Sequence, residues 1–298
     1  MLRLGALGNI IQSLGPFAAI RAHHRNAAIT LLTRGAYANW LGHAPYFDRV
    51  WIDDAPNWWD LPGWLHLRRR LIAGRFERVY DLQTSRRSSR YFQLFPRAAR
   101  PQWSGIARGC SHPDPDPERD RRHDLERQRG QLCAAGIADV PEADVSWTDG
   151  DLARFALPQR IALLVPGSAP HRPDKRWPAE HYRTMATALA ARGLVPVIVG
   201  SAAERPLAAA IRDGGAVIDL TGQTTLGDVA ALARRATLAI GNDTGPMHLI
   251  AAAGCRSVVL FSHASDPALC APRGRSVSVL RRPNLADLSP DAVLPLLG

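Results

Sequence analysis

The chain alternates short apolar runs rich in β-branched residues with longer segments of helical periodicity, and this alternation restricts its fold more than any other feature. The pattern is typical of parallel sheets covered by helices on both faces. The first run is short, a length that would fit a natural start lying a few residues upstream. The strand-like runs lie at residues 2–4, 29–32, 50–52, 78–82, 161–165, 195–199, 216–220, 237–240 and 257–261.

Several of the intervening helical segments carry capping signals. Pro178 stands where a first helical turn tolerates proline, and Gly193 is placed to end the same helix. Thr225 and Asp228 have the spacing of a capping box. We therefore expect helices at residues 17–24, 37–43, 65–73, 123–135, 177–192, 225–236 and 246–254.

Two segments interrupt the alternation. Residues 111–122 combine three prolines with dense charge, which predicts a surface loop. Residues 140–157 have the loose composition of a domain link. A chain of 298 residues suits two domains. We predict one α/β domain at 1–150 and a second at 151–298.

The charge balance calls for an anionic partner. The chain has 37 basic and 27 acidic residues, a formal net charge of +10, which fits a nucleotide, a nucleic acid or a membrane face. Between Arg68 and Arg129, 16 arginines stand against eight acidic residues. No apolar run reaches the ~18 to 20 residues of a membrane span, and no signal peptide is evident. The four cysteines have no metal-site or disulfide spacing. We expect a soluble cytoplasmic protein.

One region of the second half has the features of a phosphate site. Lys175 is the only lysine of the chain, which suggests a position where arginine cannot replace a compact ammonium. A strand at 237–240 leads through a polar turn into a helix expected to begin at Pro246, and helix N-termini bind phosphate. Pro166-Gly167-Ser168 follows the strand at 161–165, at the carboxyl end where ligands bind in such sheets. A plain capped helix with Asp243 or Thr244 as its N-cap is the alternative.

Glu204 follows the strand at 195–199, where an acidic residue can accept hydrogen bonds from a ribose. A solvated residue in a first helical turn is the other interpretation.

Five segments resemble glycosyltransferase family 9, the ADP-heptose:lipopolysaccharide heptosyltransferases. They span nearly the whole chain in the family's order, and the last two are the most specific. The segments are RLGALG at 3–8, YDLQ at 80–83, PGS at 166–168, KRWP at 175–178 and GNDTGPMH at 241–248.

The resemblance implies a GT-B architecture, in which two Rossmann-like domains with doubly wound parallel sheets face each other across a cleft. It also implies inverting, metal-independent transfer of a sugar from an ADP-sugar, with no further cofactor. Lys175 and Asp243 would act in catalysis. The donor-binding residues would be Gly167, Ser168, Lys175, Glu204, Asp243, Thr244, Gly245, Pro246, Met247 and His248, although His248 could equally be a packing residue.

The first domain would face the acceptor, an anionic lipopolysaccharide-core or related saccharide on a lipid of the inner membrane. Peripheral contact with the cytoplasmic face of that membrane is the corresponding expectation. A solvated helix face is the alternative for the arginines. The acceptor-side residues would be Gly8, Asp81, Gln83, Arg86 and Arg87.

The first loop departs from the family. Family members carry a Gly-Asp pair whose aspartate is the proposed base, and this chain has Gly8-Asn9. An amide cannot take a proton from the acceptor. Three explanations stay open: another carboxylate such as Asp81 replaces the base, water mediates a slower deprotonation, or the protein binds nucleotide sugars without catalysis.

Two other classes fit less well. Nucleic-acid binding has the charge but no recognisable module, and we expect no nucleic-acid partner. An NAD-dependent oxidoreductase would need a GxGxxG fingerprint that residues 5–8 lack. The tryptophans of the first half suit a core, a membrane interface or base stacking. They are Trp40, Trp51, Trp58, Trp59 and Trp64.

Overall fold

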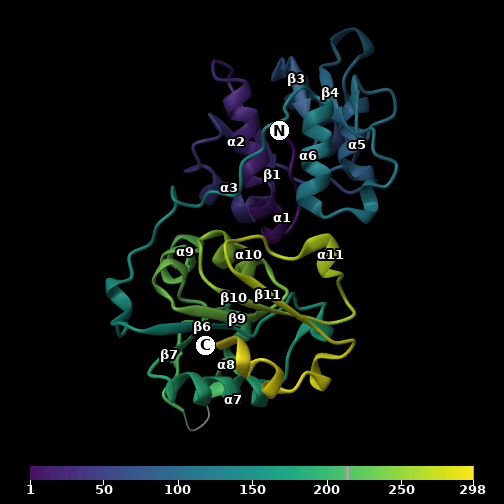
Figure 1. Ribbon diagram of the computed structural model, residues 1–298. Coiled ribbons are helices and arrows are strands. Elements are labelled where there is room, and N and C mark those ends of the chain that lie inside the picture. The colour runs from purple at the N-terminus through teal and green to yellow at the C-terminus, as the bar shows by residue number, and fades with distance from the viewer. Residues whose placement is uncertain (213–214, 298) are drawn as a thin grey trace. The chain divides into compact units, whose positions relative to one another are not determined.

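The computed structural model describes residues 1–212 and 215–297, and the chain divides into two compact units, Met1–Ala143 and Asp144–Gly298. The division falls inside the segment 140–157, whose composition predicts a link between domains. Each unit contains parallel strands with helices packed against them (Figure 1). Within the described ranges, no helix is both long enough and apolar enough to cross a bilayer.

The strands of unit 1 are all parallel and form two small sheets that the start of the chain joins. Leu2 bridges to Leu32 on one side and to Asp81 on the other. The order is therefore β2, β1, Leu2, β3, β4, β5, in which the direction of winding reverses between Leu2 and β3. The strands are β1 (Thr30–Thr33), β2 (Arg49–Ile52), β3 (Arg78–Tyr80), β4 (Gln102–Gly105) and β5 (His112–Pro113).

Two expectations for unit 1 are wrong in detail, and one strand was missed. The strand expected at 2–4 is a single bridging residue, because the chain turns after Leu4 into a helix that contains both Gly8 and Asn9. The segment 111–122 is not entirely loop, since His112 and Pro113 pair with β4 as β5. The strand β4 itself was not expected. The helices are α1 (Leu7–Gln12), α2 (Leu14–His23), α3 (Gly35–Leu41), α4 (Leu61–Ala73), α5 (Arg86–Leu94) and α6 (Asp124–Ala134).

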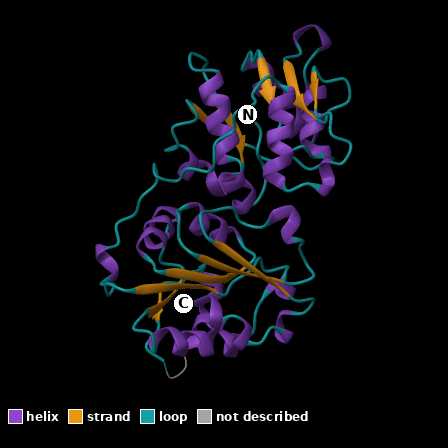
Figure 2. Ribbon diagram, viewed as in Figure 1, coloured by secondary structure: helices purple, strands orange, loops and turns teal. Residues whose placement is uncertain are grey.

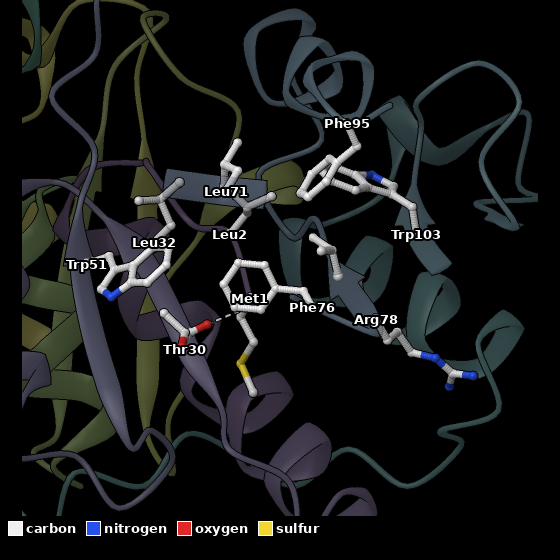
Figure 3. Close-up of a pocket in the computed structure, with 11 residues that line it drawn as sticks. Met1, Leu2, Thr30, Leu32, Trp51, Leu71, Phe76, Arg78, Phe95 and Trp103 are labelled. Atoms are coloured by element: carbon white, nitrogen blue, oxygen red, sulfur yellow. Dashed lines mark hydrogen bonds between the residues drawn. The ribbon is translucent and has the colours of Figure 1, made fainter. Parts of the chain in front are cut away.

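Aromatic and aliphatic side chains fill the interior of unit 1. Trp103 on β4 is 1% exposed and packs against Phe92 and Phe95 from α5 and the residue that follows it. A small pocket opens among side chains of this kind, including Leu32, Leu71 and Phe76 (Figure 3). Its lining contains none of the site residues expected from the sequence.

Unit 2 has one six-stranded parallel sheet in the order β11, β10, β9, β6, β7, β8. Winding reverses between β6 and β9, which lie side by side. All five residues of β6, β9 and β10 are buried, as continuous apolar runs in a sheet covered on both faces require. The edge strand β11 was not expected. The strands are β6 (Ile161–Val165), β7 (Val195–Ile198), β8 (Ile218–Asp219), β9 (Leu238–Asn242), β10 (Ser257–Phe261) and β11 (Val277–Arg281).

Helices cover both faces of this sheet, with α7 and α8 on one side and α9 and α10 on the other (Figures 1 and 2). The capping box of Thr225 and Asp228 is confirmed at the start of α9. Gly193 follows α7 with a φ of +71°, a left-handed conformation that favours glycine. The helices are α7 (Ala179–Ala190), α8 (Arg205–Arg212), α9 (Leu226–Arg235), α10 (Gly245–Ala252) and α11 (Pro267–Cys270).

Candidate functional site

The polar residues of unit 2 gather where the winding of its sheet reverses. The strands β6 and β9 are neighbours and end at Val165 and Asn242. In an open parallel sheet, the crevice beyond these two carboxyl ends is the usual place for a ligand. The turn 166–168 and the turn 243–244 both start there.

Asn242, at the end of β9, fixes the walls of this crevice. Its side chain is fully buried, and its Oδ1 accepts hydrogen bonds from the Trp177 amide (3.1 Å) and the Tyr182 hydroxyl (3.0 Å). Its Nδ2 donates to the carbonyls of Pro166 (2.7 Å) and Gly167 (3.2 Å). One amide group therefore ties β9 to the turn after β6, to the loop before α7 and to α7 itself.

Replacing Asn242 with alanine should lower the free energy of unfolding of unit 2 by about 2 kcal/mol, because four buried polar groups lose a hydrogen bond. Within the described ranges, only the Tyr182 hydroxyl keeps another, to the Val165 carbonyl at 3.3 Å. Urea denaturation followed by circular dichroism measures the change. Asn284→Ala is the matched control, since its exposed side chain only caps a short turn. Equal stability of the two variants would show that Asn242 does not hold the crevice together.

Lys175 and Asp243 form an ion pair in the crevice. Lys175 ends a 3-10 turn at Pro173–Lys175, and its Nζ lies 2.5 Å from Asp243 Oδ2. Ser265, beyond β10, donates its hydroxyl to the same oxygen at 2.6 Å. The His248 ring lies 3.9 Å from Asp243 Oδ1 and is mostly buried. The sole lysine of the chain is thus positioned by a buried carboxylate that follows β9.

The helix α10 starts directly beside this pair. It begins at Gly245, one residue before the expected Pro246, and Thr244 occupies the N-cap position. The Thr244 hydroxyl is buried and makes no hydrogen bond within the described part of the chain, so it does not cap the helix. The first amides of a helix have no partner inside the helix and carry part of its dipole charge. Met247, in this first turn, is fully buried and packs against the β-sheet glycine Gly241.

Ser168 and Glu204 follow the neighbouring strands β6 and β7 and shape the backbone at their carboxyl ends. The Ser168 hydroxyl donates to the Arg172 carbonyl (2.8 Å) and accepts from Arg176 Nε (2.9 Å), which shapes the loop that carries Lys175. Glu204 lies at the end of a 3-10 turn, where its Oε2 accepts the amide of Ser201 at 2.6 Å. Its other oxygen lies against Gly167, where an added Cβ would come within 1.6 Å of it. Glycine at 167 therefore leaves room for this carboxylate at the strand ends.

In unit 1, Asn9 lies in the first turn of α1, with an exposed side chain. Its carbonyl accepts hydrogen bonds from Arg3 Nε (3.2 Å) and the Ser13 hydroxyl (2.8 Å). Arg3 is 2% exposed and also donates to the Leu82 carbonyl and to Asp124. One buried guanidinium therefore joins the start of α1 to the segment after β3. Gly8 is buried in the same helical turn.

Asp81 follows β3 and is fully buried. Its Oδ1 accepts the amides of Gln83 (3.1 Å) and Thr84 (3.0 Å), while Oδ2 has no hydrogen bond within residues 1–212 and 215–297. Burial raises the pKa of Asp81 to about 6, an effect that the nearby Ser88 side chain and those two amides counteract only in part. Gln83 accepts the Leu4 amide through its side chain at 2.8 Å. Both side chains therefore hold the turn after β3 in shape.

The two arginines expected on the acceptor side have different surroundings. Arg86 is exposed at the start of α5. Arg87 donates to the Tyr91 hydroxyl (2.8 Å) and the Pro56 carbonyl (3.2 Å), and its guanidinium lies over the Trp64 ring at 5.4 Å. Arg87 thus joins α5 to the segment before α4, and Arg86 extends into solvent.

The structure brings Gly167, Lys175, Glu204 and Asp243 to one edge of the unit 2 sheet. Gly8, Asn9, Asp81 and Gln83 gather at the corresponding edge of unit 1. Four residues of these networks were not expected from the sequence: Arg3, Asp124, Asn242 and Ser265. For Ser265, a signal existed in the mostly polar run 262–266, which follows β10 just as 243–244 follows β9.

The matches to known proteins include residues of both units. The family model described as glycosyltransferase family 9 (heptosyltransferase) matches residues 64–291. Lipopolysaccharide heptosyltransferase 1 of Escherichia coli (strain K12) is 32% identical over 190 residues, which cover 60% of this chain and 57% of that protein. Lipooligosaccharide heptosyltransferase 2 of Haemophilus influenzae is 30% identical over 127 residues, covering 41% and 36%. The matches therefore span less than two thirds of these curated relatives.

Solved structures share the fold over nearly the whole chain. Escherichia coli ADP-heptose lipopolysaccharide heptosyltransferase II superposes with a TM-score of 0.77 at 21% identity, covering 99% of this chain and 96% of that one. A family 9 glycosyltransferase from Veillonella parvula gives a TM-score of 0.83 at 20% identity, covering 99% and 94%. The expected fold class, a GT-B protein with two Rossmann-like units of parallel sheet, is confirmed. The chain belongs to glycosyltransferase family 9, the heptosyltransferases.

Proposed function

We propose that this protein transfers a heptose from ADP-heptose to an anionic acceptor of the lipopolysaccharide-core type, by an inverting reaction that needs no metal. Membership of family 9 supports the reaction class. A structural neighbour with the same fold is described as heptosyltransferase WaaC with ADP, which supports an ADP-sugar as donor.

The observation that carries the proposal is the ion pair of Lys175 and Asp243 beside the N-terminus of α10. When the bond to the anomeric carbon breaks, negative charge develops on the departing ADP. The ammonium of Lys175 and the first amides of α10 would stabilise that charge, as preorganised donors do. Glu204 would accept hydrogen bonds from the ribose, and Asp243 would keep Lys175 in place until the diphosphate binds.

The acceptor would bind to unit 1 near Gly8, Asp81, Gln83, Arg86 and Arg87. Exposed Arg86 supplies positive charge for an anionic sugar, and the buried Asp81 would shape the turn that carries Gln83. Because this acceptor is a lipid-linked saccharide, the protein would work in peripheral contact with the cytoplasmic face of the inner membrane.

Asn9 limits the proposal for catalysis. Its exposed side chain lies in the first turn of α1, where family members have the aspartate base, and an amide cannot accept the acceptor proton. A second candidate function follows from this residue: a homologue that binds the nucleotide sugar without transferring it. Both candidates use the same donor site.

We expect the protein to release ADP from ADP-heptose only when a lipid A core acceptor is present, and Asn9→Asp to increase the rate by supplying a base. Coupled detection of ADP measures this for both proteins, and excess EDTA should leave the rates unchanged. A silent natural chain with an active Asn9→Asp variant would favour the binding homologue. Silence from both would reject the proposed donor or acceptor.

A further inference from the structure

Four large apolar side chains at the start of α4 are exposed to solvent. Trp58 is 79% exposed, Trp59 65%, Leu61 66% and Leu65 42%. We call these four residues the tryptophan loop surface. They are close in sequence, and Leu61 and Leu65 share one face of α4 because they are four residues apart. A concentration of exposed aromatic and aliphatic surface of this kind marks an interaction site.

The other tryptophans of this region are covered. Trp103 is 1% exposed, Trp51 lies under the Arg70 guanidinium at 4.6 Å, and Trp64 lies under Arg87. Trp58 and Trp59 instead contact each other edge to face, with ring centroids 5.3 Å apart. The fold therefore buries Trp103, half-buries Trp51 and Trp64, and leaves the pair of Trp58 and Trp59 exposed.

Hydrogen bonds hold the backbone beneath the two rings. Asp60 accepts the Gly63 amide at 2.9 Å and so caps α4. Trp64 donates its indole N–H to the Asn57 carbonyl at 2.9 Å, and Arg87 donates to the Pro56 carbonyl at 3.2 Å. The segment 56–64 is thus tied to α4 and α5. The two exposed tryptophan rings therefore project from a backbone that hydrogen bonds hold in place.

Exposed arginines on two neighbouring helices outnumber the acidic residues Asp54 and Asp60 of the segment that carries the tryptophan loop surface. The bond from Arg87 to Pro56 places the start of α5 beside it, where Arg86 and Arg90 are exposed. On α4, Arg68 and Arg69 are exposed as well. Residues 1–143 contain 21 arginines and 14 acidic residues, a formal net charge of +7. The surface therefore combines apolar rings with a surplus of cations.

We infer that the tryptophan loop surface inserts into the headgroup region of an anionic lipid bilayer. Tryptophan suits this region because its ring is apolar and its N–H can remain hydrated, and nearby arginines attract anionic headgroups. A protein partner recognised by apolar contact alone would not require the nearby positive charge. The biological purpose of the contact rests on the proposed function, since a lipid-linked acceptor lies in such a bilayer, but bilayer binding itself requires neither donor nor acceptor.

Vesicle sedimentation with the full chain tests the inference, using phosphatidylcholine vesicles with and without one quarter phosphatidylglycerol, and no glycolipid. We expect binding to the anionic vesicles, and we expect Trp58→Ala/Trp59→Ala to weaken it about tenfold or more. Ile106→Ala is the matched control, because it removes another exposed apolar side chain of unit 1. Unchanged thermal unfolding of the double variant shows that the fold is intact.

A second measurement detects insertion directly. Lipids brominated in the acyl chain should quench the tryptophan fluorescence of the natural chain, and Trp58→Phe/Trp59→Phe should bind with similar affinity but lose most of that quenching. Three results would overturn the inference. They are equal vesicle binding by the double alanine variant, equal quenching in the double phenylalanine variant, and a double alanine variant that loses self-association of the protein but not vesicle binding. ADP release with a soluble, deacylated acceptor should not change in the alanine variant, so failure of the anchor is distinguishable from failure of the proposed reaction.

Discussion

Replacing Lys175 with alanine is expected to lower kcat/KM for the ADP-sugar by about 10²- to 10³-fold, the usual effect of removing one preorganised charge donor. Its ammonium lies 2.5 Å from Asp243 Oδ2, beside the first amides of α10. In the alanine variant, charge on the leaving diphosphate would be met only by those amides. Initial rates of ADP release at several donor concentrations measure the change. Calorimetry should also show weaker ADP binding for Lys175→Ala and for Asp243→Ala.

Two further variants separate position from charge. Arg192→Ala removes one exposed positive charge after α7, and it should leave both rate and affinity unchanged. Lys175→Arg keeps the charge but replaces the compact ammonium with a planar fork, so it should recover only part of the activity. ADP affinity that stays the same in both Lys175→Ala and Asp243→Ala would reject the crevice between β6 and β9 as the donor site. Full activity in Lys175→Arg would show that total charge, and not this lysine, matters.

The sequence predicts the fold of unit 2 well because its strands are buried on both faces. The runs 161–165 and 257–261 match β6 and β10 residue for residue, since a central parallel strand is a continuous apolar run between breakers. The edge strand β11 (Val277–Arg281) was missed because two of its residues are exposed and its run ends in arginine. In β4 (Gln102–Gly105), a glutamine, a serine and a glycine hide the pattern.

The site is predictable where it consists of turns that follow strands. Residues 166–168 and 243–245 are recognisable by position alone, since they come directly after apolar runs. The ion pair of Lys175 with Asp243 joins positions 68 residues apart, and periodicity carries no information on such pairing. The same is true of Arg3, whose three partners include Asp124, 121 residues away. Contacts of this kind depend on the order of the strands in the sheet, which the local sequence pattern does not predict.

Replacing Asp81 with asparagine is expected to raise the stability of the protein by about 3 kcal/mol at pH 7.5 and by only about 1 kcal/mol at pH 4.5. The ordinary pKa of an aspartate is 3.8, and burial raises that of Asp81 to about 6. Between these values the folded protein keeps a proton that the unfolded chain releases, so the free energy of unfolding falls as pH rises. Above pH 6 the carboxylate is ionised in both states and the penalty is complete. Asparagine does not titrate and avoids it.

Urea unfolding of both proteins at the two pH values measures this difference, and Asp139→Asn, at an exposed position of unit 1, serves as the control. A stability difference that does not change with pH would mean that Asp81 does not titrate as its burial requires. The variant also tests whether Asp81 replaces the base that Asn9 lacks. A fully buried carboxylate whose Oδ1 already accepts two amides is poorly placed to take a proton from an acceptor hydroxyl. We therefore expect Asp81→Asn to keep whatever transferase activity the natural chain has, whereas loss of that activity in a stable variant would identify Asp81 as the base.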